Sequence, residues 1–229
     1  MSAELPPEKT SPQPPDTSAP PRAVPFYRNP YVLIFVAGAI VLTLMRPLLR
    51  RDPPPPPIDG VLPLFSLTNE KGEPMGSKEL SGTVYIANFL FTQCSTVCPL
   101  TVRSLLELQA RYEEAKVPIR IVSFSVDPQT DTPDVLRTYG QAAGAKPERW
   151  SFLTGKETDV STVLAGFKMA LEPKKTMGNG LMEIAHSQKL VIVDGRGALR
   201  GFYASDKDGI DEVFHRSRHV LYEAEKQSD

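Results

Sequence analysis

The sequence is poor in cysteine and in net positive charge, and each shortage excludes a class of function. Two cysteines among 229 residues cannot build a multi-bridge disulfide scaffold, a four-thiolate zinc site or an iron–sulfur cluster with four Cys ligands. Lys and Arg number 26 against 27 Asp and Glu, a net charge of −1, so no basic surplus exists to neutralise nucleic-acid phosphates. We therefore expect no nucleic-acid partner, and we expect the two cysteines to act as one pair.

Proline is distributed unevenly, because most of the 23 prolines precede residue 64. Residues 1–29 are Pro-rich and polar, with too few large apolar side chains to offset the entropy of ordering them. This composition predicts a disordered tail, and its acidic residues disfavour a mitochondrial presequence. A second Pro-rich stretch, residues 50–58, predicts an extended polyproline linker that holds the following domain away from the preceding segment.

Residues 31–45 contain no charged side chain. With Tyr27, Arg28 and Arg46 at the interfaces, this stretch becomes long enough to span a bilayer. A buried core helix would not stand alone between two Pro-rich stretches, and arginines and prolines follow where a signal peptidase needs small residues. We predict a retained transmembrane anchor at 30–49, whose orientation the flanking arginines do not settle.

From residue 59 to residue 229, short β-branched runs alternate with longer runs of helical period. This alternation predicts an α/β domain, with a mostly parallel central sheet flanked by helices. The expected strands are 61–68, 83–91, 119–126, 150–153, and an antiparallel hairpin of 189–193 with 198–203. The expected helices follow the cysteines, the Thr132–Pro133 cap, the loop before Val160 and the hairpin.

Cys94 and Cys98 lie between a predicted strand and a predicted helix, in the sequence CSTVCP. The amide N–H groups and the dipole at a helix N-terminus lower the pKa of a thiol, so both sulfurs should be reactive. A disulfide that closes so short a loop would stabilise the fold by only about 2 kcal/mol. Two interpretations remain open, a soft-metal site and a redox couple.

A metal site needs a further ligand, and the chain has three histidines. His215 and His219 are four residues apart on the last predicted helix, away from its apolar stripe, as is typical of a solvated face. His186 precedes the strand 189–193, where a sheet would carry it towards the strand-end loops that hold the cysteines. Taken by itself, this histidine is better explained by capping or packing at the start of the strand.

Three stretches in order, FLFTQCSTVCPLT, SFSVDPQTDTP and AHSQKLVIVDGRGALRGFY, resemble the SCO/SenC family of membrane-tethered, thioredoxin-like copper proteins. The resemblance covers nearly all of residues 59–222. It implies a thioredoxin-like fold with an N-terminal strand extension, and copper bound by Cys94, Cys98 and His186. It further implies an upstream copper donor, and delivery of the copper to the CuA-bearing subunit of cytochrome c oxidase.

The residue chemistry agrees with copper. Two thiolates and one imidazole suit three-coordinate Cu(I), and Cu(II) if the geometry opens, whereas structural zinc normally has four ligands. The chain departs from the family at Ala185, where many members have an acidic residue that could orient the histidine. Asp127 and Asp131 match the family's acidic loop, for which the resemblance implies contact with partners, although Asx-turn and helix-capping roles explain them about as well.

A different function is open for the same cysteines. Cys94 and Cys98 could be the redox-active pair of a thiol–disulfide oxidoreductase that acts on oxidase or other extracytoplasmic thiols. The Cys-x3-Cys spacing, in place of Cys-x-x-Cys, argues against this alternative. A copper or redox sensor and a peroxidase are weaker alternatives. The resemblance places the protein in a bacterial cytoplasmic membrane as a single-pass protein, with its C-terminal domain on the periplasmic or outer side.

Overall fold

The structure is a computed structural model that describes residues 29–49, 55–93, 98–169, 175–176, 182–183 and 189–228. The chain divides into two units between residues 53 and 54. The first unit contains helix α1 (Pro30–Leu49), and the second contains the strands and the other helices. The division falls inside the stretch that the sequence marks as a linker.

Helix α1 forms over the segment that was predicted to be a membrane anchor. Large apolar side chains along it, such as Phe35 and Leu42, are exposed. Among the helices of the described residues, however, none has the length and apolar character that crossing a membrane requires. The prediction of a transmembrane anchor at 30–49 is therefore not supported.

The second unit is built on an eight-stranded sheet in the order β1-β10-β9-β4-β5-β6-β2-β3. Its strands are β1 (Gly60–Val61), β2 (Ser66–Asn69), β3 (Pro74–Gly76), β4 (Tyr85–Leu90), β5 (Arg120–Ser125), β6 (Trp150–Thr154), β9 (Lys189–Val193) and β10 (Ala198–Ala204). Only β4, β5 and β6 pair in parallel, and the remaining pairs are antiparallel. β7 (Lys175–Thr176) and β8 (Met182–Glu183) pair separately. The predicted α/β architecture is confirmed, but the prediction of a mostly parallel sheet is wrong, because parallel pairing is restricted to the central strands β4, β5 and β6.

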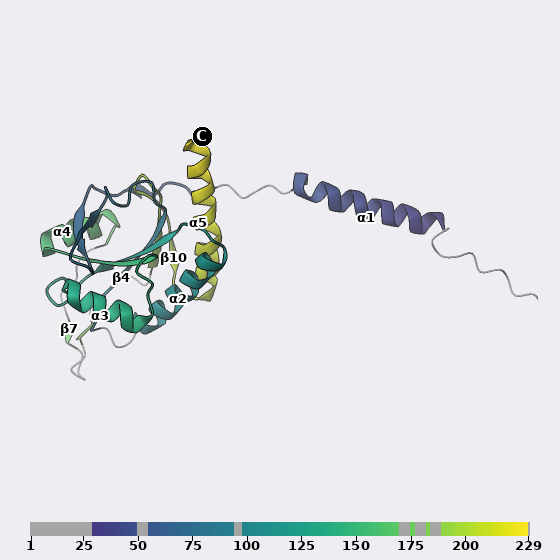
Figure 1. The fold of residues 1–229 in the computed structure, drawn as a ribbon. Helices are drawn as coiled ribbons and strands as arrows, with labels where there is room; N and C mark the ends of the chain where they lie inside the picture. The colour runs from purple at the N-terminus through teal and green to yellow at the C-terminus, as the bar shows by residue number, and fades with distance from the viewer. Residues whose placement is uncertain are drawn as a thin grey trace, which may run out of the picture. The chain divides into compact units, whose positions relative to one another are not determined.

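The central strand β4 is buried on both faces, as its continuous apolar sequence predicts. On the face of Ile86, it belongs to an apolar cluster with residues of α2 (Cys98–Glu114), α3 (Pro133–Ala143) and α5 (Lys207–Ser228). On the face of Phe89, it packs against α4 (Glu157–Gly166) and against apolar residues between Leu62 and Leu80. Helix α4 lies across the sheet from α2 and α5 (Figure 1). Two apolar cores therefore hold the strand from both sides.

Helix α3 begins as its sequence predicts. Thr132 is the N-cap, with an extended backbone, and its hydroxyl accepts a hydrogen bond from the Val135 amide at 3.4 Å. Pro133 occupies the first turn, where a missing N–H group has no effect on the helix. Gly144 ends the helix at φ 84°, a left-handed conformation that glycine adopts without strain.

The single strand expected at 61–68 is instead two strands in different parts of the sheet. β1 pairs with β10 at one edge, whereas β2 pairs with β3 and β6 towards the other edge. Pro63 lies in the connection between them, and proline has no N–H group to donate to a neighbouring strand. The prediction of one strand is therefore wrong, because the apolar pattern continues through residues at which the strand pairing is interrupted.

The end of the Pro-rich linker packs on the domain. Pro56 is buried, and its carbonyl oxygen accepts a hydrogen bond from Arg200 Nε at 2.9 Å. The Asp59 amide donates to the Leu199 carbonyl at 2.9 Å. Pro56, near the end of the predicted linker, is therefore attached to β10 through Arg200.

Candidate functional site

The candidate site is built at the edge of the sheet that the ends of strands β4 and β5 form, rather than at a lateral edge such as β1 or β3. β4 and β5 run in parallel with Leu90 paired to Ser125, so both strands end at this edge. The Val126 amide donates to the Leu90 carbonyl at 2.8 Å and extends the pairing by one residue. β9 runs antiparallel to β4, so its first residue, Lys189, lies towards the same edge. The segments that lead to the predicted ligands therefore enter and leave the sheet here.

The three predicted ligands differ in what the structure says of them. Cys98 is the first residue of α2. Cys94 and His186 lie outside the described residues, so the predicted copper set remains a prediction. In the part of the chain that the structure does describe, no group of three or more His, Cys, Asp or Glu residues is arranged to hold a metal ion.

Helix α2 provides a favourable environment for a thiolate at its start. The helix is 17 residues long, and its first turn contains no acidic residue. The amide N–H groups at its N-terminus therefore keep their positive field, which stabilises a thiolate relative to a thiol. The predicted strand–turn–helix setting of the cysteine pair is confirmed for Cys98.

Asp131 lies at the same edge and is fully buried, at 0% exposure. Its Oδ1 accepts hydrogen bonds from the Thr92 amide at 3.1 Å and from the Thr92 hydroxyl at 2.6 Å. Its Oδ2 accepts one from the Ser125 hydroxyl at 2.6 Å. Burial raises the pKa of Asp131, while these hydrogen bonds from Ser125 and Thr92 act in the opposite direction.

Asp127 organises the loop between β5 and α3. Its carbonyl accepts hydrogen bonds from the amides of Thr130 and Asp131, at 3.0 and 2.9 Å. Its own amide donates to the Ser125 hydroxyl at 3.0 Å. The side chains of Asp127 and Asp131 are both buried, at 4% and 0% exposure. Partner contact through these two residues stays a prediction that their burial does not favour.

Thr92 and Ser125 are the residues that the sequence did not single out. They bind the Asp131 carboxylate from the ends of β4 and β5, and Thr92 comes two residues before Cys94. One sequence feature could have indicated Thr92, because it is a hydroxyl residue between a buried strand and the cysteines. The distance of 39 residues between Thr92 and Asp131 hid the contact.

The two histidines of the last helix have a structural setting. His215 is exposed on α5 and lies edge-on to the Phe214 ring, with centroids 5.4 Å apart. His219, one turn further on, is half-buried. Arg111 of α2 and Arg218 lie over the same Phe214 ring, at 4.2 and 5.4 Å. These contacts agree with the prediction that the histidine pair belongs to a helix surface.

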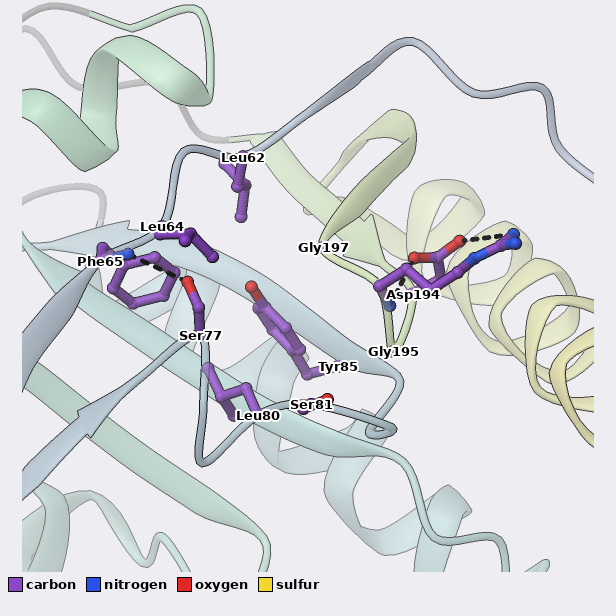
Figure 2. A pocket seen from close by; sticks show the side chains of 11 residues that line it. Leu62, Leu64, Phe65, Ser77, Leu80, Ser81, Tyr85, Asp194, Gly195 and Gly197 are labelled. Atoms are coloured by element: carbon purple, nitrogen blue, oxygen red, sulfur yellow. Dashed lines mark hydrogen bonds and ion pairs between the residues drawn. The ribbon is translucent and has the colours of Figure 1, made fainter. Parts of the chain in front are cut away.

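A cavity of about 170 Å³ lies at the opposite end of β4 (Figure 2). It is lined by Leu62, Leu64 and Leu80, and the Tyr85 hydroxyl is directed towards Leu62 and Leu64 (Figure 2). Burial, and to a smaller extent the Asp194 carboxylate, raises the pKa of Tyr85. Because Tyr85 begins the strand and the cysteines follow its end, this cavity is separate from the candidate site.

Comparison with known proteins finds relatives that are named as SCO proteins. A relative called SCO1 protein homolog, from Bacillus subtilis (strain 168), is 30% identical over 151 residues, which are 65% of this chain and 77% of the relative. The solved structure of BsSco, a member of the Sco family of cytochrome c oxidase assembly proteins, has a TM-score of 0.65 at 24% identity. That comparison covers 75% of this chain and 99% of BsSco.

The structure of Bradyrhizobium japonicum ScoI with copper bound has a TM-score of 0.60 at 22% identity. The match covers 70% of this chain and 99% of ScoI, and with that of BsSco it confirms the thioredoxin-like fold. A sequence model of the family described as SCO1/SenC matches residues 58–221. That match spans both cysteines, the Asp127–Asp131 loop and His186, and the chain belongs to the SCO1/SenC family.

Proposed function

We propose that the protein is a copper chaperone that binds copper through Cys94, Cys98 and His186. It would deliver this copper to the CuA centre of cytochrome c oxidase during assembly. The observation that carries the proposal is the sheet edge at which β4 ends and β9 begins. Membership of the SCO1/SenC family, and the copper bound to the relative ScoI, support the choice of metal.

The length of chain between the edge and the ligands supports their convergence. Cys94 is two residues beyond Thr92, and His186 is three residues before Lys189. An extended chain spans at most about 3.6 Å per residue, so Cys94 lies within about 7 Å of Thr92 and His186 within about 11 Å of Lys189. β4 and β9 are neighbouring strands, and neighbouring strands lie about 4.8 Å apart. These chain lengths would allow the thiols and the imidazole to reach one ion.

The donor set supports copper as the cargo and its transfer as the function. Thiolates and imidazole favour Cu(I), and a three-ligand site leaves room for an incoming ligand from a recipient. Transfer is then a ligand exchange in which the recipient's thiolates or imidazoles bind copper as Cys94, Cys98 and His186 release it. Because Ala185 offers no carboxylate to the imidazole, the His186 bond should be the weakest of the three.

Anaerobic titration of the full chain with Cu(I), against a competing chelator, tests the binding. We expect one tightly bound copper per chain, loss of tight binding in Cys94→Ser and Cys98→Ser, and weaker binding in His186→Ala. His215→Ala is the matched control, because His215 is exposed on α5, and it should bind as the unaltered chain does. Binding that is unchanged in the cysteine variants would reject the site.

Thiol–disulfide exchange is the second candidate function, and one observation favours it. Helix α2 begins at Cys98 with no acidic residue in its first turn, and a helix N-terminus favours the thiolate, the form that attacks disulfides. Incubation with the oxidised CuA-bearing subunit distinguishes the two candidates. An oxidoreductase in its dithiol form would reduce that subunit's disulfide in the absence of copper, while its own Cys94 and Cys98 thiols become a disulfide. A chaperone without reductase activity would transfer copper only to the reduced subunit.

Location and recipient belong to the same proposal. We place the domain on the outer side of a bacterial cytoplasmic membrane, where it would receive copper from an upstream donor and meet the CuA-bearing subunit. Membership of the family of the oxidase assembly protein BsSco supports this recipient. Protease treatment of spheroplasts tests the location, because the domain should be digested while cytoplasmic marker proteins survive. A protected domain would contradict it.

A further inference from the structure

The end of strand β4 is attached to the loop that precedes α3 through one carboxylate. Thr92, the second residue after β4, donates both its amide and its hydroxyl to Asp131 Oδ1, at 3.1 and 2.6 Å. Ser125, the last residue of β5, donates its hydroxyl to Asp131 Oδ2 at 2.6 Å. Both carboxylate oxygens are therefore engaged within the domain, and Asp131 joins the ends of two neighbouring strands.

Asp131 itself is firmly held. Its side chain has no exposed surface, and its amide donates to the Asp127 carbonyl at 2.9 Å. The next residue, Thr132, is the N-cap of α3, so the carboxylate extends from the start of a regular helix. The capping bond is made by Thr132, which leaves Asp131 free of that role. A carboxylate with this burial and three donors has one stable position.

Thr92 leads directly into the cysteine loop, the segment between Thr92 and Cys98. Thr92 precedes Cys94 by two residues, and α2 begins at Cys98. The loop is therefore fixed at one end by the Asp131 carboxylate and at the other by a helix. A metal site that is assembled from distant segments requires its ligands to be held within about 0.5 Å of the productive geometry by supporting contacts. The Thr92 anchor is the contact that performs this task nearest to Cys94 among the described residues.

We propose that Asp131 is a positioning residue for the copper ligands, because its bonds to Thr92 fix the point from which the Cys94 loop leaves the sheet. This inference rests on the proposed copper site and assigns to the acidic loop a role inside the domain. Asp131 does not bind the metal in this role. It determines where the Cys94 thiolate stands relative to Cys98 and His186.

Three variants of the full chain test the role through the anchor itself. Thr92→Val removes the hydroxyl donor but keeps the branched shape, whereas Thr92→Ser keeps the hydroxyl donor. Ser123→Ala is the matched control, because Ser123 is a buried hydroxyl on the same strand as Ser125. It binds Asn88 at 2.6 Å and Trp150 at 2.7 Å, away from the cysteine loop. Asp131→Asn is informative in addition if it folds.

The measurements are Cu(I) affinity by chelator competition, the reduction potential of the Cys94/Cys98 pair in a thiol buffer, and thermal unfolding. We expect Thr92→Val to weaken copper binding by about tenfold, the lower range for losing a supporting contact of a ligand. Thr92→Ser should bind as the unaltered chain does. Ser123→Ala should lose thermal stability while it keeps the copper affinity and the reduction potential.

The outcomes separate this inference from the proposed function. If the unaltered chain fails to bind Cu(I), the proposed function is wrong, and the reduction potential still reports on the anchor. If Thr92→Val changes neither the affinity nor the potential, or if Ser123→Ala changes them equally, the positioning role is overturned. Weak copper binding in Thr92→Ser would likewise overturn the positioning role, because loss of the hydroxyl would then not be the cause of weak binding in Thr92→Val.

Discussion

Asp194 contacts two arginines, and the structure predicts very different consequences for their removal. Arg200 Nη1 lies 3.2 Å and Arg196 Nη2 lies 3.7 Å from the same oxygen, Asp194 Oδ2. The Arg200 and Asp194 side chains are each 4% exposed, whereas the Arg196 side chain is 65% exposed. Arg200 also binds Glu223 and the Pro56 carbonyl. Replacement of Arg200 by leucine therefore removes the buried one of the two cations that contact this buried carboxylate.

The loss of unfolding free energy in Arg200→Leu can be estimated from the burial of the Arg200–Asp194 pair. Removing one partner of a buried ion pair costs about 3 to 5 kcal/mol, because the buried Asp194 carboxylate then keeps only the exposed Arg196 at 3.7 Å and the amides of Arg196 and Ala198. For a domain of this size, each kcal/mol lowers the melting temperature by about 2 to 4 °C, so Arg200→Leu should lower it by about 6 to 20 °C. Arg196→Leu breaks an exposed pair that solvent screens, and it should cost less than about 1 kcal/mol.

Thermal and urea unfolding of the two variants, followed by circular dichroism, is the assay. Arg196→Leu serves as the control, because it removes the same side-chain type from the same carboxylate. Limited proteolysis adds a local readout, since Arg200→Leu should also release Pro56 and expose the preceding linker to cleavage. If Arg200→Leu destabilises the protein no more than Arg196→Leu does, the reasoning from burial is refuted.

Three further perturbations have defined outcomes. Gly140→Ala should cost about 1 to 3 kcal/mol of unfolding free energy by overpacking, because an added Cβ would lie 2.7 Å from Phe152 Cε2; a neutral effect in urea unfolding would contradict this packing. Tyr112→Phe should cost about 1 kcal/mol, because it removes a buried hydrogen bond of 2.7 Å to Ser217; a double-mutant cycle with Ser217→Ala should show coupling, and strict additivity would reject it. Burial raises the pKa of Asp131, so the folded protein binds this proton more readily than the unfolded chain does. The stability of the unaltered chain relative to Asp131→Asn should therefore fall as the pH rises from about 4 through the folded pKa, and level off above it; unfolding at a series of pH values checks this, and a difference independent of pH would contradict it.

The central strands could be predicted because their physical signal is local. The run from residue 83 to residue 91 is short and apolar at nearly every position, which is typical of a strand covered on both faces, and β4 is buried throughout. Thr132 followed by Pro133 likewise predicts the start of α3, because capping depends on neighbours within one turn. Cys98 at the start of α2 follows from the same local logic.

The features that escaped prediction depend on distant partners. The hydrogen bond of Asp131 to Thr92 spans 39 residues, and that of Arg200 to Pro56 spans 144. A polar loop offers no pattern that separates a buried aspartate from an exposed one. The segment 61–68 misled for a related reason, because its apolar pattern continues while the chain passes from β1 to β2 on different parts of the sheet.

X-ray absorption spectroscopy of the copper-loaded full chain tests the central claim most directly, because it identifies the atoms bound to the metal. The account predicts a first coordination shell of two sulfurs and one imidazole nitrogen. One sulfur should be lost or replaced in Cys94→Ser and in Cys98→Ser, and the imidazole signal should be lost in His186→Ala. A copper shell without sulfur, or a spectrum unchanged by all three substitutions, would contradict the account.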